Sequence, residues 1–262
     1  MQKTFVFPIV LLAALFSSSL LAGTAKTVYA AEEISGMDKN EWIFDLPEAK
    51  DKDTKQLFAV SCDGMDKTTA TLYFLERDEK GNWKEILTSD AYVGSNGLCR
   101  DEDHQEGISK TPTGTYTFTE AFGIADDPGC AMPYTKLNEY MWWSGDSREG
   151  MQYNQMIDIR DYPNLDLACS EHLIDCWPEY KYCLNISFNE DGTPYKGSAI
   201  FLHCLTPGVP YTAGCVAIPE EKMEQVIKEV QEGCVVIIDT EENLMKKQKE
   251  NNKQRRKTRF FV

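Results

Sequence analysis

One histidine and one cysteine lie within a short stretch, residues 197–219, whose composition suits nucleophilic catalysis. His203 directly follows the apolar run 199–202, which predicts a buried strand, and Cys215 directly precedes a second apolar run. A free thiol gives little thiolate at neutral pH, so it needs a neighbouring base, and an imidazole can take its proton. We therefore expect a Cys215 nucleophile with a His203 base, the imidazole holding the thiolate as an ion pair.

The residues just before the cysteine are the candidates for stabilising an acyl-transfer intermediate. Gly214 has no side chain, so its backbone can approach a substrate and leave N–H groups free for an oxyanion. Gly214 and Thr212 are therefore the predicted oxyanion and support residues. The competing interpretation is that Cys215 is a buried core cysteine and His203 a satisfied strand-end histidine. The spacing and the small-Gly-Cys context favour catalysis over it.

The letters TAGCV at 212–216, placed behind His203 and a loop, resemble the signature of the L,D-transpeptidase catalytic domain (YkuD-like) family. That signature is a histidine, a loop, and then Ser/Thr-x-Gly-Cys. Two further segments carry the same resemblance. VGSNG at 93–97 is similar to the family's Gly-x-Asn-Gly segment, and KTPTGTY at 110–116 to its Thr-Pro-x-Gly-x-Phe/Tyr segment. Together the three segments place the domain over most of the chain.

The chain departs from the usual family pattern at three points. The loop between His203 and Cys215 is shorter than usual, Ala213 stands where many members have a second histidine, and Ala217 stands where many have an arginine. Because the nucleophile, the base and Gly214 are intact, the resemblance is to a variant branch of the family rather than to a dead enzyme.

The resemblance implies a mainly β fold, a sandwich-like or barrel-like sheet with one or two short helices. The residues point the same way. Strand-like runs at 57–60, 70–75 and 113–118 are separated by turn signals such as 78–82. Apolar residues with helical spacing between 219 and 233 predict one helix packed on the sheet. A mainly β architecture is therefore expected.

The resemblance also implies an activity on peptidoglycan stem peptides. Cys215 would attack the carbonyl of an L-centre–D-Ala bond, D-Ala would leave, and an amine on a neighbouring stem would take the acyl group, giving a 3→3 cross-link. His203 would act as base and then as acid, oriented by a backbone carbonyl because no nearby Asp or Asn suggests itself. Tyr153 and Asn154 resemble part of the family's pocket wall and are the predicted substrate-binding residues. No cofactor and no metal are expected.

Two other classes of function stay open at this point. The first is an L,D-carboxypeptidase, in which water replaces the amine and hydrolyses the same bond. The second is a non-catalytic cell-wall-binding module with Cys215 in a disulfide. The sequence does not identify the stem-peptide chemistry or the acceptor amine.

The chain divides into four expected parts. Residues 1–30 have a basic start, an apolar run and a small-residue site, which together are typical of a cleaved signal peptide. A retained membrane anchor is the alternative. Residues 31–55 are charged and are expected to form a linker or loosely attached N-terminal arm, residues 56–240 the catalytic domain, and residues 241–262 a basic C-terminal tail that is solvated and frayed. The protein is therefore expected to be exported, to an extracellular or cell-wall location.

The charge of the chain limits its partners. The formal net charge is −15 at pH 7, which argues against binding to nucleic acid. An acidic surface also repels anionic wall polymers at long range, so a glycan-peptide must be held in a local cleft. The basic tail is the one segment that suits contact with an anionic polymer or a membrane surface. A monomer is expected.

Nine cysteines bear on the redox state of an exported protein. The odd number leaves one thiol free, for which Cys215 is the natural candidate, and eight that could pair. The alternative is that most are reduced and buried. Of the other histidines, His104 lies in a polar loop and is expected to be solvated. His172 follows Ser170 in a predicted short helix and is expected to be structural.

Overall fold

The computed structural model describes residues 41–259, with side chains over 42–253. The predicted signal peptide and the first part of the predicted arm lie outside these residues. The elements, in chain order, are η1 (Glu41–Asp45), α2 (Pro47–Lys50), β1 (Gln56–Cys62), β2 (Thr69–Arg77), β3 (Trp83–Tyr92), β4 (Leu98–Arg100), η2 (Asp101–Asp103), β5 (Thr111–Gly123), β6 (Tyr134–Lys136), β7 (Met141–Trp143), β8 (Met156–Asp158), β9 (Glu171–His172), η3 (Leu173–Asp175), η4 (Glu179–Lys181), β10 (Cys183–Ile186), β11 (Phe201–Cys204), β12 (Val216–Ile218), α3 (Glu220–Glu229), β13 (Val235–Thr240) and α4 (Glu241–Arg259).

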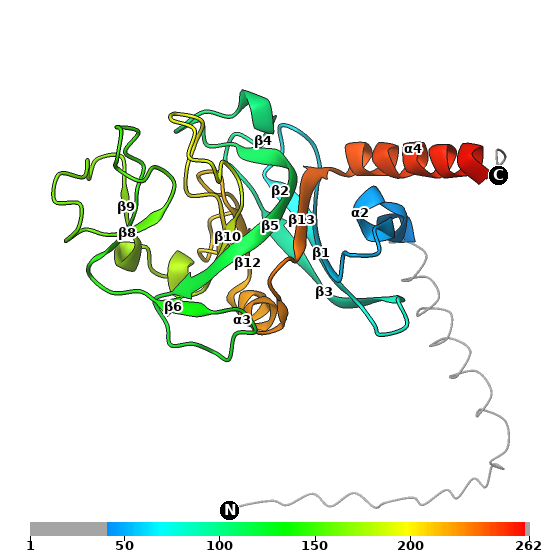
Figure 1. The fold of residues 1–262 in the computed structure, drawn as a ribbon, viewed down its shortest axis with the longest axis horizontal. Helices are drawn as coiled ribbons and strands as arrows, with labels where there is room; N and C mark the ends of the chain where they lie inside the picture. The colour runs from blue at the N-terminus through cyan, green and yellow to red at the C-terminus, as the bar shows by residue number, and fades with distance from the viewer. Residues whose placement is uncertain (1–40, 260–262) are drawn as a thin grey trace, which may run out of the picture. The chain divides into compact units, whose positions relative to one another are not determined.

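The main sheet closes on itself (Figure 1). Its strand order is β10-β11-β12-β3-β2-β1-β13-β5, and β10 also pairs with β5, which completes a ring. The short strands β4 and β6 are added to β5 outside that ring. A closed ring leaves few unpaired edges, so the expectation of a mainly β, barrel-like fold is confirmed.

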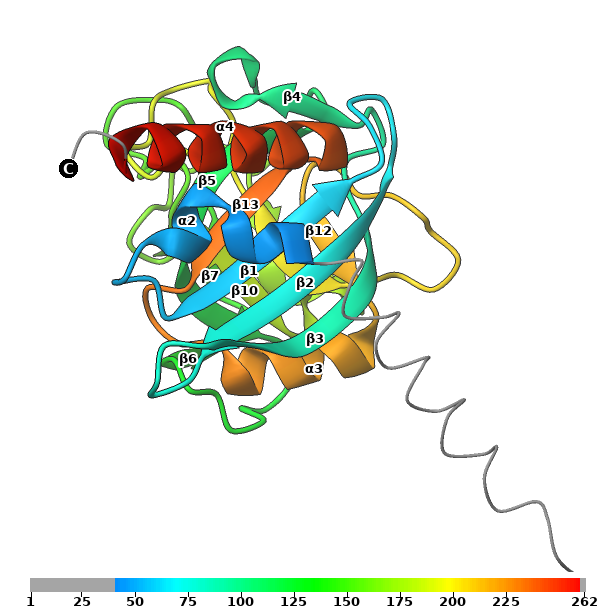
Figure 2. The same ribbon diagram turned by 90° about the vertical axis from the view of Figure 1, so that its right-hand side faces the viewer.

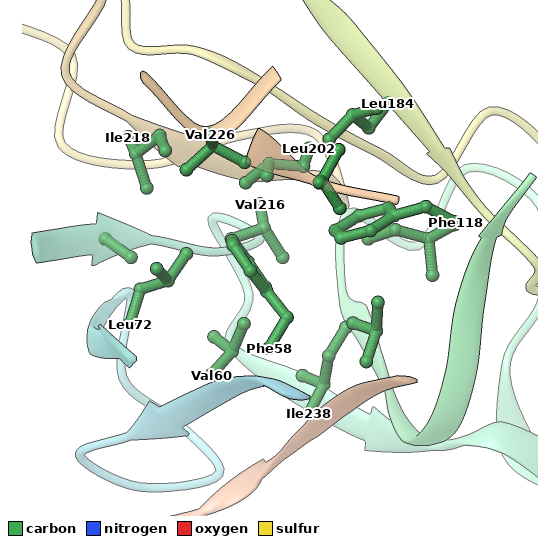
Figure 3. Close-up of a cluster of buried hydrophobic side chains, with 14 of the residues drawn as sticks. Phe58, Val60, Leu72, Phe118, Leu184, Leu202, Val216, Ile218, Val226 and Ile238 are labelled. Carbon is green, nitrogen blue, oxygen red and sulfur yellow. The ribbon is translucent and has the colours of Figure 1, made fainter. Parts of the chain in front are cut away.

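The interior of this ring is a single apolar core. Strand β1 is buried along its whole length, because it lies between β2 and β13 with covered faces. Figure 3 shows Phe58, Leu202 and Ile238 from three separate strands directed toward the same space. Helix α3 adds Val226 and its neighbours to this core, as its helical apolar spacing predicts.

The ends of the described chain pack together on a second apolar cluster. Ile43 and Leu46, from the segment expected to be a loose arm, are fully buried together with Leu244 of α4. Asp45 accepts hydrogen bonds from Gln248 and Asn252. Figure 2 shows α2 and α4 side by side in front of β1 and β13.

Two expectations about the chain's ends therefore need correction over the residues described. The part of the arm from residue 42 onward is packed on the barrel, because its apolar side chains find a complementary surface on β1, β2 and β13. The tail is helical through Arg259 rather than frayed. Two of its lysines are paired within the protein, Lys246 with Glu242 and Lys247 with Asp239.

A small three-stranded sheet, in the order β8-β7-β9, forms a lobe beside the barrel. Trp143 of β7 is buried against Phe201 and Phe122, so it is part of a core rather than of an exposed groove. The predicted helix after Ser170 is instead β9 followed by a 3-10 turn. Two residues of β9 pair with β7, and this pairing outweighs the local helix signal.

The nine cysteines all lie in the described part and are all free thiols. The eight cysteines that the sequence left available for pairing therefore form no disulfide in this structure. They match the alternative expectation of reduced and mostly buried thiols. None of the helices within residues 41–259 combines the length and the apolar character needed to cross a membrane.

Candidate active site

His203 lies on β11, Cys215 directly precedes the adjacent strand β12, and both residues face the same side of the sheet. In the parallel register of β11 and β12, Leu202 pairs with Val216 and His203 with Ala217. Side chains alternate along a strand, so Cys215, two positions before Ala217, points to the same face as His203. Both line one pocket of about 800 Å³. The strand register thus brings together the two residues that the sequence singles out.

The imidazole of His203 is held by the next peptide of its own strand. Its Nδ1 donates to the carbonyl oxygen of Cys204 at 2.8 Å, as expected where no carboxylate or amide is available. The ring of Tyr180 packs edge-on against it, with ring centres 5.7 Å apart. With the proton on Nδ1, Nε2 carries a lone pair and can accept a proton.

The thiol of Cys215 lies among backbone groups at the start of β11. Its Sγ donates to the carbonyl oxygen of Ala199 at 3.1 Å and accepts from the N–H of Phe201 at 3.3 Å. Burial, and then the charge of Glu171, hold the pKa of Cys215 above its ordinary value. Burial also lowers the pKa of His203.

Both shifts oppose the expected thiolate–imidazolium pair. Burial disfavours the charged form of each group, and so it favours a neutral thiol beside a neutral imidazole. In such a pair His203 can act as a base during the attack of Cys215 on a substrate, when the proton leaves the sulfur.

Two threonine hydroxyls fix the turn that carries the nucleophile. Thr111 is fully buried, and its hydroxyl lies 2.6 Å from the carbonyl oxygen of Gly214 and 3.2 Å from that of Cys215. The same hydroxyl accepts from the N–H of Gly94 at 2.9 Å. Thr212 donates to the carbonyl oxygen of Cys215 at 2.7 Å. All three segments that carried the family resemblance therefore meet at this turn.

Gly94 has a steric reason to be glycine at this junction. A Cβ on it would lie 2.5 Å from the carbonyl oxygen of Ser109 and 2.8 Å from Cα of Lys110. Its neighbour Ser95 donates its N–H to the carbonyl oxygen of Thr212 at 2.8 Å. The close approach of two backbones at Gly94 thus lets this segment brace the loop of the nucleophile.

The structure bears on Gly214 and Thr212, the predicted oxyanion and support residues. The N–H of Gly214 donates to the hydroxyl of Thr212 at 3.1 Å, so it is occupied in this structure. The N–H of Cys215 itself has no hydrogen-bond partner within the described chain. Gly214 and Thr212 therefore shape the turn, and the backbone N–H of Cys215 is the group that is free to meet an oxyanion.

Tyr153 and Asn154 lie outside the pocket lining, in contrast to the predicted role in substrate binding. The hydroxyl of Tyr153 accepts from the N–H of Gly197 at 2.9 Å and donates to Glu106. The side-chain oxygen of Asn154 accepts from the N–H of Ala199 at 3.0 Å and from the indole of Trp143. Their polar atoms are used by the protein, so both are positioning residues for the segment that leads into β11.

Ala199 has a backbone conformation that L-residues rarely adopt, with φ at 56°. Because of this conformation the strand begins two residues later than the apolar pattern predicts, so β11 starts at Phe201. The same conformation also directs the carbonyl oxygen of Ala199 at the thiol of Cys215 and its N–H at Asn154. A strained residue is thus held between the nucleophile and a positioning side chain.

The two remaining histidines have different places. His104 is buried and lines the pocket, where we expected a solvated residue. Its ring nitrogens lie 2.7 Å from the carbonyl oxygen of Lys196 and 3.0 Å from that of Lys110. His172 lies outside the pocket lining, paired with Asp175 and stacked on Trp142. Neither competes with His203 as the base, because both ring nitrogens of each are occupied.

The pocket has acidic walls that the sequence did not reveal. Glu106, Glu171 and Glu179 line it, and none of the described lining residues is a lysine or an arginine. Glu171 comes from β9 in the lobe and meets the barrel only through the tertiary fold. No sequence spacing connects it with Cys215. Across residues 42–253 there is also no group of three or more side chains suited to hold a metal ion.

The ring of strands defines a β-barrel protein, and one pocket of it holds both the thiol of Cys215 and the imidazole of His203. The family model described as the L,D-transpeptidase catalytic domain, YkuD, matches residues 65–238. That match spans about two-thirds of the chain, so the chain belongs to the YkuD family of L,D-transpeptidase catalytic domains.

Similar solved structures include L,D-transpeptidase 1 of Mycobacterium tuberculosis, with 9% identity, 70% of this chain and 61% of that chain covered, and a TM-score of 0.32. An L,D-transpeptidase from Mycobacterium smegmatis has 12% identity, coverages of 71% and 59%, and a TM-score of 0.32. A fused Zn-dependent amidase/peptidase/peptidoglycan-binding protein from Clostridium acetobutylicum has 12% identity, coverages of 84% and 65%, and a TM-score of 0.35. This chain thus spans less than two-thirds of each. No curated protein matched the chain.

Proposed function

We propose that the chain is an exported cysteine acyltransferase that forms 3→3 cross-links between peptidoglycan stem peptides. The observation that carries the proposal is the placement of Cys215 and His203 on one face of adjacent strands, in one pocket, with Nδ1 of His203 occupied by a carbonyl. The family assignment supports the substrate class. Export is inferred from the composition of residues 1–30 alone.

The proposed reaction has two half-reactions. In the first, Sγ of Cys215 attacks the carbonyl carbon of the L-centre–D-Ala bond while Nε2 of His203 takes the thiol proton. The backbone N–H of Cys215 faces the developing oxyanion. His203 then gives its proton to the amine of D-Ala, the C–N bond breaks, and a thioester remains. In the second, an amine of a neighbouring stem attacks the thioester and the sulfur leaves.

The test is incubation with purified disaccharide-tetrapeptide, followed by mass analysis of the products. Wild-type protein is expected to release D-Ala and to form a cross-linked dimer, and Cys215→Ala is expected to lose both by several orders of magnitude while keeping its fold. Circular dichroism of the variant supplies the folding control. Turnover by Cys215→Ala at a rate near that of wild type would refute the assignment of the nucleophile.

A second measurement tests the thioester directly. A carbapenem-type β-lactam is expected to add its mass once to the wild-type protein and not to Cys215→Ala. A protein that releases D-Ala without forming dimers, whether or not an acceptor amine is present, would instead be the L,D-carboxypeptidase. Cys215 is a free thiol in the structure, so the alternative with this residue in a disulfide has no structural support.

A further inference from the structure

A half-buried carboxyl group without a cationic partner in the described chain lines the active-site pocket. Oε2 of Glu171 accepts a hydrogen bond from the hydroxyl of Tyr180 at 2.5 Å. Its other oxygen, Oε1, has no hydrogen-bond partner in the described chain. This oxygen is not one of the fully buried polar atoms that lack a partner there, so it is open to the pocket. No lysine or arginine among residues 42–253 forms an ion pair with Glu171. One carboxylate oxygen is therefore fixed while the other is available to a ligand in the pocket.

Glu171 lines the same pocket as the sulfur that the proposed reaction acylates. Its charge is the second-largest reason, after burial, that the pKa of Cys215 is raised. Tyr180, which holds Glu171, also packs its ring against His203. A group bound at Oε1 of Glu171 thus lies in the same pocket as Cys215 and His203, and Tyr180 links this carboxylate to the imidazole.

The wider pocket favours a cationic ligand. Glu106 and Glu179 line it together with Glu171, and the described lining residues include no lysine or arginine. Ala217 stands where the family pattern has arginine, so no guanidinium compensates these acids. Carboxylates in a partly desolvated pocket raise the local concentration of cations and repel anions. In the second half-reaction of the proposed function, the group that must reach the thioester enters the pocket as an ammonium.

We propose that Glu171 binds the ammonium group of the acyl acceptor and takes its first proton, so that the acceptor arrives beside the thioester as a neutral amine. The inference rests on the proposed function and concerns its second half-reaction. The ligand class is a primary ammonium, such as that on the side chain of a diamino acid in a stem peptide. Tyr180 is then a positioning residue that fixes the carboxylate.

The protons and bonds of this step balance. The ammonium gives one proton to the carboxylate of Glu171 and becomes an amine. The amine nitrogen attacks the thioester carbon, forming a C–N bond, and the C–S bond breaks. The second proton leaves the nitrogen for Nε2 of His203, which delivers it to Sγ of Cys215. The products are an amide, a neutral thiol and a protonated Glu171, which returns its proton to solvent through the pocket.

The environment of Glu171 suits this role. Burial is the largest effect on its carboxyl and raises its pKa, and the hydrogen bond from Tyr180 partly opposes the shift. A carboxylate with a raised pKa is a better proton acceptor for an ammonium than an ordinary surface carboxylate. The groups that face it are Tyr180, Cys215 and Cys176, together with the more distant Glu106.

The experiment separates the two half-reactions in the full protein and in Glu171→Gln. Acylation by the disaccharide-tetrapeptide is followed by intact mass after rapid quenching. Transfer is followed with two small acceptors, methylamine, which is cationic at neutral pH, and hydroxylamine, which is uncharged there. Glu139→Gln is the matched control, because Glu139 is an exposed glutamate of the same lobe outside the pocket lining.

In Glu171→Gln, kcat/KM for methylamine is expected to fall by about tenfold or more, as for loss of a hydrogen bond to a charged group. Acylation and transfer to hydroxylamine are expected to change by about twofold or less, because neither uses an ammonium at Glu171. Tyr180→Phe should change the same quantity in the same direction by a smaller factor. Glu171→Asp should recover part of the loss.

Several results would overturn the inference. Equal losses with both acceptors, or a loss confined to acylation, would assign Glu171 to the fold or to the donor. An equal loss in Glu139→Gln would make the effect one of net charge. If Glu171→Gln transferred the acyl group to methylamine as fast as wild type, the role given to Glu171 would be wrong, while the proposed function would still stand. A wild-type protein that is never acylated at Cys215 would overturn the proposed function, and this inference with it.

Discussion

The hydroxyl of Thr111 is the strongest test of how the nucleophile is positioned. Thr111→Val keeps the shape of the side chain and removes the hydroxyl, so the N–H of Gly94 loses its acceptor and the carbonyl of Gly214 its donor. Both groups are buried at this junction, and each unsatisfied buried group costs about 1–3 kcal/mol. For the two groups together we therefore expect the free energy of unfolding to fall by about 2–6 kcal/mol.

The same substitution is expected to slow acylation of Cys215 by a carbapenem on the order of 10- to 100-fold, because the turn before the thiol loses its fixed place. Urea unfolding measures the first effect and time-resolved intact mass the second. Thr113→Val is the matched control, since Thr113 lies on the same strand and its hydroxyl has no hydrogen-bond partner within residues 42–253. Unfolding within about 0.5 kcal/mol of wild type, together with an unchanged acylation rate, would refute the role given to Thr111.

Three further predictions follow from the burial of single groups. Burial lowers the pKa of His203 in the native state. Below about pH 6.5 the unfolded chain therefore binds a proton at this histidine that the native state does not bind. The free energy of unfolding should fall as the pH is lowered from about 6.5 toward the pKa of His203 in the native state. Urea unfolding between pH 7 and 5 should show a smaller loss in His203→Gln, and an equal loss would contradict the shift. Iodoacetamide at pH 7 should label the exposed Cys169 well before the buried Cys215, which peptide mapping can check. Asn154→Leu removes the oxygen that accepts from Ala199 and Trp143 and the amide group that donates to the carbonyls of Phe188 and Asn189. It should cost at least about 3 kcal/mol in urea unfolding, and a near-neutral result would show that these bonds are replaced by water.

The meeting of His203 and Cys215 in one pocket could be predicted from the sequence because the information for it is local. His203 and Cys215 each adjoin a short apolar run, and two such runs that form neighbouring strands bring their ends to one place. The barrel could be predicted in outline for the same reason, from alternating strands and turn signals. The pairing of β10 with β5, which closes the barrel, could not be predicted from the sequence, because any free strand edge could have paired with β5.

The rest of the site depends on contacts between residues far apart in the chain. Glu171 reaches the pocket because the lobe folds back on β11, and Asn154 reaches Ala199 for the same reason. The protonation state of the pair could not be predicted from spacing, because spacing says nothing about burial, and burial opposes the charged forms here. Thr111 lies in a segment that resembled the family, but its hydrogen bonds to the turn of Cys215 appear only in three dimensions.

The packing of α2 against α4 has a consequence for the connectivity of the domain. Asp45 is bonded to side chains of Gln248, Asn251 and Asn252, so the first and last described elements lie next to each other. The apolar cluster beneath them shares no residue with the cluster that contains Cys215. A circular permutant that joins α4 to η1 through a short linker, and opens the chain in the exposed turn at residues 78–82, should keep the same barrel and the same pocket. The order in which the strands are synthesised could then be changed without changing which strands are neighbours.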